Sequence, residues 1–135
     1  MPEINVFTKG FNDIVDITDE VAKIVKNSDI KDGIVTLFVV GSTATVTTIE
    51  YEPGLVEDIK NALEKIAPMG GVYRHEEAWH DGNGYAHIRA SLMKPSITIP
   101  IENGRLLLGT WQQIILIDFD NRPRNRKIIV KLLKC

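Results

Sequence analysis

The segment Ser96–Leu108, with the sequence SITIPIENGRLLL, decides the fold class of this chain. At its centre the dipeptide Asn103-Gly104 separates two apolar runs. A type I′ turn needs positive φ at both of its central positions, and Asn-Gly meets that need with little steric cost. The segment therefore predicts a β-hairpin, with strands at Ser96–Ile101 and Arg105–Leu108.

Further strand signals lie on both sides of this hairpin. Ile34–Val40 is rich in β-branched residues, and Thr43–Ile49 contains four threonines. Turn signals at Lys94-Pro95, Gly109 and Asp120–Pro123 divide the second half into short segments. The remaining predicted strands are Ala86–Met93, Trp111–Phe119 and Arg126–Leu133. Short strands joined by tight turns predict antiparallel pairing in a sandwich or a partly closed barrel.

Two segments have the periodicity of amphipathic helices. In the first, Thr18 is the expected N-cap, and apolar residues recur at helical spacing until the helix ends near Asn27-Ser28. In the second, Pro53 suits the first turn and Pro68 ends an apolar stripe. We therefore predict an α+β fold, mostly an antiparallel β-sandwich with two helices packed on it, in a single domain over residues 1–135.

The composition excludes several classes of protein. Of the 135 residues, 44% are hydrophobic and 25% are charged, the balance of a globular protein, and the net charge of -2 gives no general attraction to nucleic acid or to a membrane. The N-terminal residues lack the apolar run of a signal peptide. The single cysteine, Cys135, is the last residue, so an internal disulfide is impossible, and we expect a reducing, cytoplasmic location.

All three histidines lie within one window of thirteen residues: His75, His80 and His87. Imidazole nitrogens bind zinc, and catalytic zinc sites commonly use three protein ligands. Glu76 or Asp81 could supply an oxygen ligand or orient an imidazole. The spacing predicts a metal site if the loop brings the two flanking segments together. The alternative is that three solvated histidines lie in a polar loop.

Three other polar segments have both a structural and a functional interpretation. Asp81-Gly82-Asn83-Gly84 is typical of a turn, but it could also bind an anion or a hydroxyl group. The small hydroxyl residues of Gly41-Ser42-Thr43-Ala44 could donate to a phosphate or simply form a tight connection. The arginines of DNRPRNRK, residues 120–127, suit phosphate oxygens, although a charged hairpin tip is the commoner explanation.

The sequence resembles the YjbQ-like family, an uncharacterised family often labelled secondary thiamine-phosphate synthase. The resemblance rests on GRLLLGTWQ at Gly104–Gln112, on Tyr73-x-His75, and on AHIxAS at Ala86–Ser91. It continues in Ser42-Thr43-Ala44, which is followed by Thr47 and Glu50. The resemblance implies a β-sandwich assembled as a homotrimer, with a histidine-lined site that holds zinc or another divalent metal.

The resemblance assigns His75 and His87 to that metal site. A third family histidine is replaced here by Gly41, and a family asparagine by Ile49. We therefore expect His80 to supply the missing imidazole.

The family's activity would join a pyrimidine methyl diphosphate to a thiazole phosphate and release pyrophosphate. On this expectation the catalytic residues are Glu50, Asp81 and Arg89, and Arg105 is a further candidate for the diphosphate. The expected substrate-binding residues are Ser42, Thr43, Asn83, Thr110 and Gln112. The expected partner is a small molecule, with phosphorylated compounds included. The alternative is a trimeric protein that binds a metal or a ligand without thiamine-phosphate synthase activity.

Overall fold

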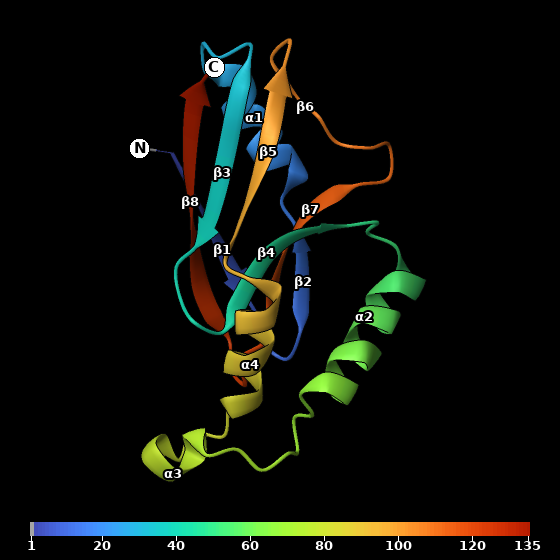
Figure 1. Cartoon of the computed structure of the whole chain (residues 1–135), viewed down its shortest axis with the longest axis vertical. Helices are drawn as coiled ribbons and strands as arrows, with labels where there is room; N and C mark the ends of the chain where they lie inside the picture. The colour runs from blue at the N-terminus through green and yellow to red at the C-terminus, as the bar shows by residue number, and fades with distance from the viewer. Residues whose placement is uncertain (1) are drawn as a thin grey trace.

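The structure is a computed structural model that describes residues 2–135, and it has the predicted α+β class. Two antiparallel sheets lie face to face, and helices flank them (Figure 1). The strands are β1 (Glu3–Thr8), β2 (Asp13–Asp16), β3 (Gly33–Val39), β4 (Ala44–Ile49), β5 (Ser96–Glu102), β6 (Arg105–Leu106), β7 (Gln113–Asp118) and β8 (Arg124–Lys134). The helices are α1 (Thr18–Asn27), α2 (Pro53–Ile66), α3 (His75–Trp79) and α4 (Gly84–Met93).

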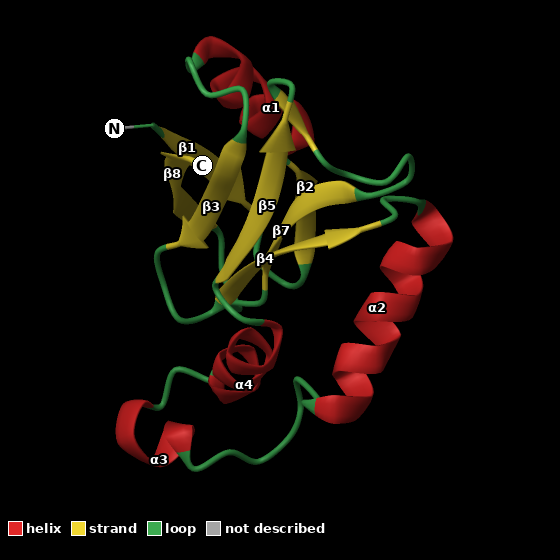
Figure 2. Ribbon diagram, turned by 45° about the horizontal axis from the view of Figure 1, so that its top comes forward, coloured by secondary structure: helices red, strands yellow, loops and turns green. Residues whose placement is uncertain are grey.

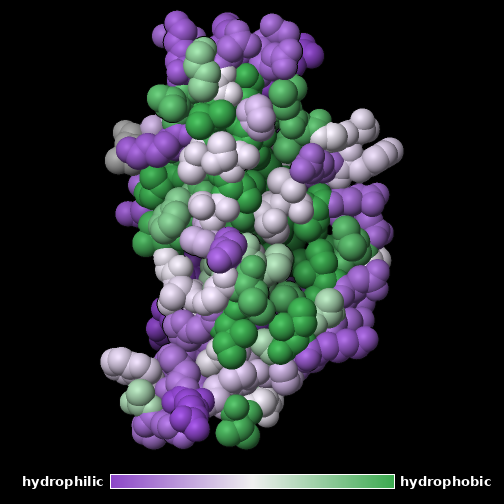
Figure 3. All heavy atoms as spheres, in the orientation of Figure 1, coloured by the Kyte–Doolittle hydropathy of each residue, from purple (hydrophilic) through white to green (hydrophobic). Residues whose placement is uncertain are grey.

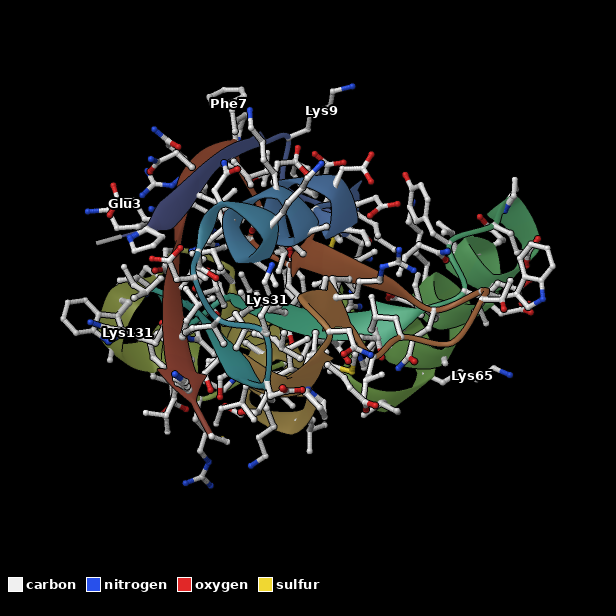
Figure 4. All side chains as sticks on the ribbon, turned by 90° about the horizontal axis from the view of Figure 1, so that it is seen from above. Glu3, Phe7, Lys9, Lys31, Lys65 and Lys131 are labelled. Atoms are coloured by element: carbon white, nitrogen blue, oxygen red, sulfur yellow. The ribbon has the colours of Figure 1, made fainter. Side chains whose placement is uncertain are left out.

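The larger sheet has the strand order β1-β8-β3-β5-β6, and the smaller sheet has the order β2-β7-β4. The predicted hairpin is confirmed, because Ile101 pairs with Leu106 and the turn residues Asn103 and Gly104 have φ values of 52° and 74°. The alternation of burial along β1 also follows the sheet geometry, and Phe7 projects outward from that strand (Figure 4).

The hydrophobic core is divided by the smaller sheet. On one side, Ile114 and Leu116 of β7 pack with the inner face of the larger sheet and with Val21 and Val25 of α1. On the other side, Ile115, Ile117 and Phe119 pack against α2 and α4 (Figure 2). Strand β7 is therefore buried on both faces, which explains why its sequence is a continuous apolar run rather than an alternating one.

Three predictions about secondary structure were wrong. The N-cap of α1 is Ile17, and Thr18 is its first helical residue. Ala86–Met93 was expected to be a strand but belongs to α4, and the described chain has four helices rather than two. The buried residues of α4 include Tyr85, Ala86, Arg89 and Ala90, which lie on one helical face. This face packs on the smaller sheet, so tertiary burial decides the conformation. None of the helices in residues 2–135 has the length and apolar character needed to cross a membrane.

Candidate functional site

Helices α3 and α4 bring two of the three histidines together at one end of the molecule. The ring centroids of His75 and His87 lie 4.4 Å apart, with the ring planes inclined at 38°. His75 is the first residue of α3, and His87 lies in the first turns of α4. The two imidazoles thus come from consecutive helices, and the segment of His87 is a helix rather than the predicted strand.

Two carboxylates lie beside His75. Its Nδ1 is 3.3 Å from Glu76 Oε1 and 3.4 Å from Asp81 Oδ1. One ligand atom from each of these three residues lies within 4.8 Å of the others. An imidazole nitrogen and carboxylate oxygens are a donor set that first-row divalent metals, including zinc, accept.

Glu76 also fixes how the two helices meet. The backbone N–H of Gly84, the first residue of α4, donates to Glu76 Oε1 at 2.8 Å. A Cβ on Gly84 would lie 2.7 Å from Tyr73 Cβ and 2.9 Å from the same carboxylate oxygen. Glycine is therefore required for this close approach, and Glu76 holds both the start of α4 and the ring of His75.

The environment of His87 favours the neutral imidazole. Burial lowers the pKa of His87 below its usual 6.5, and the neighbouring His75 lowers that pKa further. Asp120, Asp81 and Glu76 act in the opposite direction but do not outweigh these two effects. A neutral imidazole keeps a free nitrogen lone pair, which can bind a metal or accept a proton.

A cavity of about 270 Å³ extends from His87 towards the larger sheet. It lies where the loop before β4, the loop before α4 and the beginning of β8 meet. Its lining residues are Gly41, Ser42, Thr43, Asp81, Asn83, His87, Asp120, Arg124 and Arg126. The lining thus combines a histidine, two carboxylates and two arginines, and Asp120 and Arg124 are in direct contact.

A buried ion pair forms part of this cavity. Arg126 donates from Nε to Asp118 Oδ2 at 2.7 Å and from Nη2 to Asp118 Oδ1 at 2.8 Å, a bidentate arrangement. Thr8 donates its hydroxyl to the same carboxylate, at 2.5 Å. The Arg126 side chain is 7% exposed and that of Asp118 is fully buried, so the guanidinium is held in one position.

Asp120 joins the remaining polar residues. Its carboxylate accepts hydrogen bonds from Thr43 Oγ1 at 3.0 Å, from Asn83 Nδ2 at 3.2 Å and from Arg124 Nε at 3.0 Å. Burial alone would raise the pKa of Asp120. The backbone N–H of Asn121 and these three side chains together hold the pKa below its usual 3.8. Asp120 therefore remains ionised and anchors both loops to β8.

Asn83 has an unused acceptor at this site. Its amide nitrogen donates to Asp120, which fixes the amide oxygen as the other end of the side chain. That oxygen is buried, and among residues 2–135 it has no hydrogen-bond partner. A buried polar atom without a partner is costly, so the atom is suited to a ligand that brings a donor or a positive charge.

Other predicted site residues lie outside this group. His80 is an exposed residue in the left-handed region, with φ of 57°, at the end of α3, and it is absent from the cluster of His75, Glu76 and Asp81. Glu50 is exposed beyond the far end of β4 and does not line the cavity. The exposed Thr110 and Gln112 precede β7, and Gln112 donates to Thr48 there at 3.0 Å.

Arg89 is also separate from the cavity. It is fully buried, and its guanidinium donates to the carbonyl of Ala67, to Asn12 Oδ1 and to Glu64. These contacts tie α4 to the end of α2 and the beginning of β2. The structure thus gives Arg89 a structural setting rather than the expected catalytic one.

Asp118 and Asp120 were not among the predicted site residues, and no role in a buried network was predicted for Arg124 and Arg126. Asp118 and Asp120 lie at and just beyond the end of a buried apolar strand, where an unpaired carboxylate would be very unfavourable. Arg124 and Arg126 follow these aspartates at alternating positions. Together, the placement of the aspartates and this spacing of the arginines indicate a buried ion-pair network. The same arginines were explained instead as a charged hairpin tip.

Comparison with known proteins gives one consistent result. The model of the family described as "UPF0047 protein YjbQ-like" matches residues 2–135. A UPF0047 protein of Archaeoglobus fulgidus is 40% identical over 131 residues, covering 97% of this chain and 99% of that protein. A UPF0047 protein of Methanothermobacter thermautotrophicus is 38% identical and covers 96% of this chain and 89% of its own.

Solved structures agree with the sequence comparison. A YbjQ-like protein of unknown function from Sulfolobus solfataricus superposes with a TM-score of 0.90 at 33% identity, covering 99% of this chain and 97% of that chain. An uncharacterised conserved protein of the yjbq/upf0047 family from Clostridium acetobutylicum has a TM-score of 0.89 at 42% identity, covering 98% of this chain and all of that one.

Proposed function

The chain belongs to the UPF0047 YjbQ-like family, and we propose that it is a metal-dependent enzyme acting on a small molecule in the cavity beside His87. The observation that carries the proposal is the convergence of His75, Asp81 and His87 from two helices and the loop between them. Imidazoles and a carboxylate brought together beside a cavity are a recurrent arrangement in catalytic sites.

The residues fit zinc or another divalent cation. His75 and Asp81 would hold it, and Glu76, already bonded to Gly84, would orient the His75 ring from the side. A bound divalent cation polarises carbonyl or phosphoryl oxygens and stabilises developing negative charge. His80 is not needed for this set, so we no longer expect it to replace the imidazole absent at Gly41.

His87 is the group best placed to move a proton or to complete the ligand set. Its imidazole lines the cavity and is 4.4 Å from that of His75, centroid to centroid. The lowered pKa keeps the ring neutral near pH 7, so it can accept a proton from a group bound in the cavity. Asn83 is suited to binding the substrate through its unpaired oxygen.

The reaction we propose is the thiamine-phosphate synthase-like transfer that the family resemblance implies. It joins a pyrimidine methyl diphosphate to a thiazole phosphate and releases pyrophosphate. A cavity of about 270 Å³ is close to the lower end of ligand pockets, about 300 Å³, so it suits one phosphate group or one small heterocycle of these substrates.

The proposal is tested with zinc-loaded protein and the two purified substrates, by following thiamine phosphate and pyrophosphate. We expect product from the native chain, and a fall of about a hundredfold or more in His87→Gln, because general acid–base groups contribute about that much. His80→Gln is the matched control and should retain activity. The proposed reaction fails if the zinc-loaded native chain forms no product.

A second function is a ligand-binding protein with the same site but without synthase activity. The observation that favours it is the position of Glu50, an expected catalytic carboxylate, which lies outside the cavity. In that case zinc and small anions would bind, but the substrates would not turn over.

A further inference from the structure

We propose that the part of the cavity lined by Arg124, Arg126 and Asn83 is a binding subsite for a tetrahedral oxyanion that still carries a proton, such as a phosphate group in its singly charged form. This inference rests on the proposed function for the view that the cavity receives a substrate, and it adds which chemical group of that substrate the cavity selects. The residues that carry it are Arg124, Arg126 and Asn83, together with the loop Gly41–Thr43.

Each arginine uses only part of its guanidinium within the protein. Arg126 bonds Asp118 and Thr43 through Nε and Nη2, and Arg124 bonds Asp120 through Nε and Nη2. In the part of the chain that the structure describes, the Nη1 groups of both residues donate to no protein atom. Because both arginines line the cavity, these two donors are available to an anion there.

Gly41 leaves the Arg126 donor uncovered. A Cβ at position 41 would lie 2.6 Å from Arg126 Nη1, and Gly41 has a φ of +129°, which side chains rarely adopt. Neither Gly41 nor Ser42 uses its backbone N–H in a hydrogen bond to another described residue. The loop therefore offers two backbone N–H groups and the Ser42 hydroxyl as donors beside the guanidinium, whereas the Thr43 hydroxyl is already bonded to Asp120.

Asn83 adds selectivity for a ligand that carries a proton. The amide nitrogen is committed to Asp120, so the buried Oδ1 can only accept. A phosphate bearing a P–OH group can donate to this oxygen while its other oxygens accept from the arginines. Sulfate has no such proton near neutral pH, so it would leave the Asn83 oxygen without a partner.

Charge alone would not create this site. Asp118 and Asp120 balance the two arginines, and Asp81 adds a further negative charge to the lining of the cavity. Binding must therefore come from donors held in fixed positions. A cation held at His75 and Asp81 would offset the charge of Asp81 and strengthen the binding of the oxyanion.

The test is calorimetric titration of chelator-treated full-length protein with inorganic phosphate at pH 6.5, and with sulfate at the same ionic strength. We expect phosphate to bind at least about tenfold more tightly than sulfate, the effect of one hydrogen bond to a charged group. Arg124→Gln should weaken phosphate binding by about tenfold or more. Arg122→Gln, an exposed arginine in the turn just before β8, is the matched control and should bind as the native chain does.

Ser42→Asp gives a second variant that does not disturb the buried network, because Ser42 is exposed. Its carboxylate should abolish phosphate binding, whereas Ser96→Asp on an exposed position of β5 should not. Equal affinity for phosphate and sulfate, or equal losses in Arg124→Gln and Arg122→Gln, would overturn the inference. Zinc binding is titrated separately, without phosphate. A protein that binds phosphate but not zinc would contradict the proposed metal-dependent enzyme and leave this subsite supported.

Discussion

Asp120 shows how a single buried carboxylate sets the shape of the cavity. It holds Thr43 from the loop before β4, Asn83 from the loop before α4 and Arg124 from β8. Each of these partners approaches from a different part of the chain. Removing the charge of Asp120 should therefore loosen three segments at once.

Asp120→Asn should lower the free energy of unfolding at pH 7 by about 2 kcal/mol, since an amide cannot accept from all these donors. The pKa of Asp120 is below its usual 3.8 in the folded chain, so its stabilising effect is present above pH 3.8 and is lost as the pH falls through the folded pKa. Urea unfolding at neutral and at acid pH measures this effect. The free energy of unfolding should fall less between the two pH values in Asp120→Asn than in the native chain.

The control is Asp58→Asn, an exposed residue of α2, which should change stability by less than about 0.5 kcal/mol. Parallel stability curves for Asp120→Asn and the native chain in the acid range would contradict the role given to Asp120.

At this scale the sequence pointed to the histidines and to the carboxylates beside His75, but not to the buried network around Asp118 and Asp120. His75, Asp81, Asn83 and His87 were identified because polar residues with ligand chemistry gather in a short window. Asp118 and Asp120 were missed although Arg126 and Arg124 follow them closely in the chain. Their other buried partners, Thr8, Thr43 and Asn83, are distant: Thr8 is 110 residues from Asp118. Only the fold brings such groups together.

Helix α4 is the element on which the site depends, and it was predicted to be a strand. The run AHIRASLM contains one β-branched residue, Ile88, and several apolar residues without strict alternation, so its sequence did not decide between strand and helix. The helical conformation is favoured because it allows Tyr85, Ala86 and Ala90 to pack on the smaller sheet. The hairpin of β5 and β6, in contrast, was predictable because its turn residues encode the geometry locally.

Gly84→Ala should separate α3 from α4. The added methyl group would lie 2.7 Å from Tyr73 Cβ and 2.9 Å from Glu76 Oε1, so α3 must move away. We expect a loss of about 2 kcal/mol of stability, typical of overpacking, together with weaker zinc binding. Gly70→Ala is the matched control, because a Cβ there meets no atom within 4 Å. Equal stability and zinc affinity in the two variants would refute this account of α3.

Arg89→Met should reduce stability without removing a catalytic group. The substitution leaves the Ala67 carbonyl and Asn12 Oδ1 without their donor in a buried position. The expected cost is about 3 kcal/mol in chemical unfolding, whereas the exposed Arg105→Met should cost less than about 0.5 kcal/mol. A fully stable Arg89→Met protein would show that these bonds do not hold α4 in place.

On the scale of the whole molecule, the outer face of the larger sheet has apolar side chains that no element of the described chain covers (Figure 3). Phe38 is paired with Ile129, and Ile34 with Leu133, so these four residues share that face. Phe38 is 45% exposed and Leu133 is 61% exposed. A second copy of the chain is the partner we expect here, in keeping with the homotrimer that the family resemblance implies.

Light scattering after gel filtration should therefore give the mass of three chains of 15.1 kDa each. Phe38→Glu should shift the mass towards one chain, because a charge would be buried in the interface. Val72→Glu places the same charge at a fully exposed loop residue and should leave the assembly unchanged. A native protein with the mass of a single chain would contradict the trimer.

The most direct test of the metal site is the zinc content of the purified protein after chelation, reloading and removal of free metal. The native chain should retain one zinc ion per chain, and His80→Ala should retain the same amount, since His80 lies outside the cluster. His75→Ala should lose it, because the ring that both carboxylates flank would be gone. Absence of zinc from the reloaded native chain, or equal loss in His75→Ala and His80→Ala, would contradict the site described for His75, Asp81 and His87.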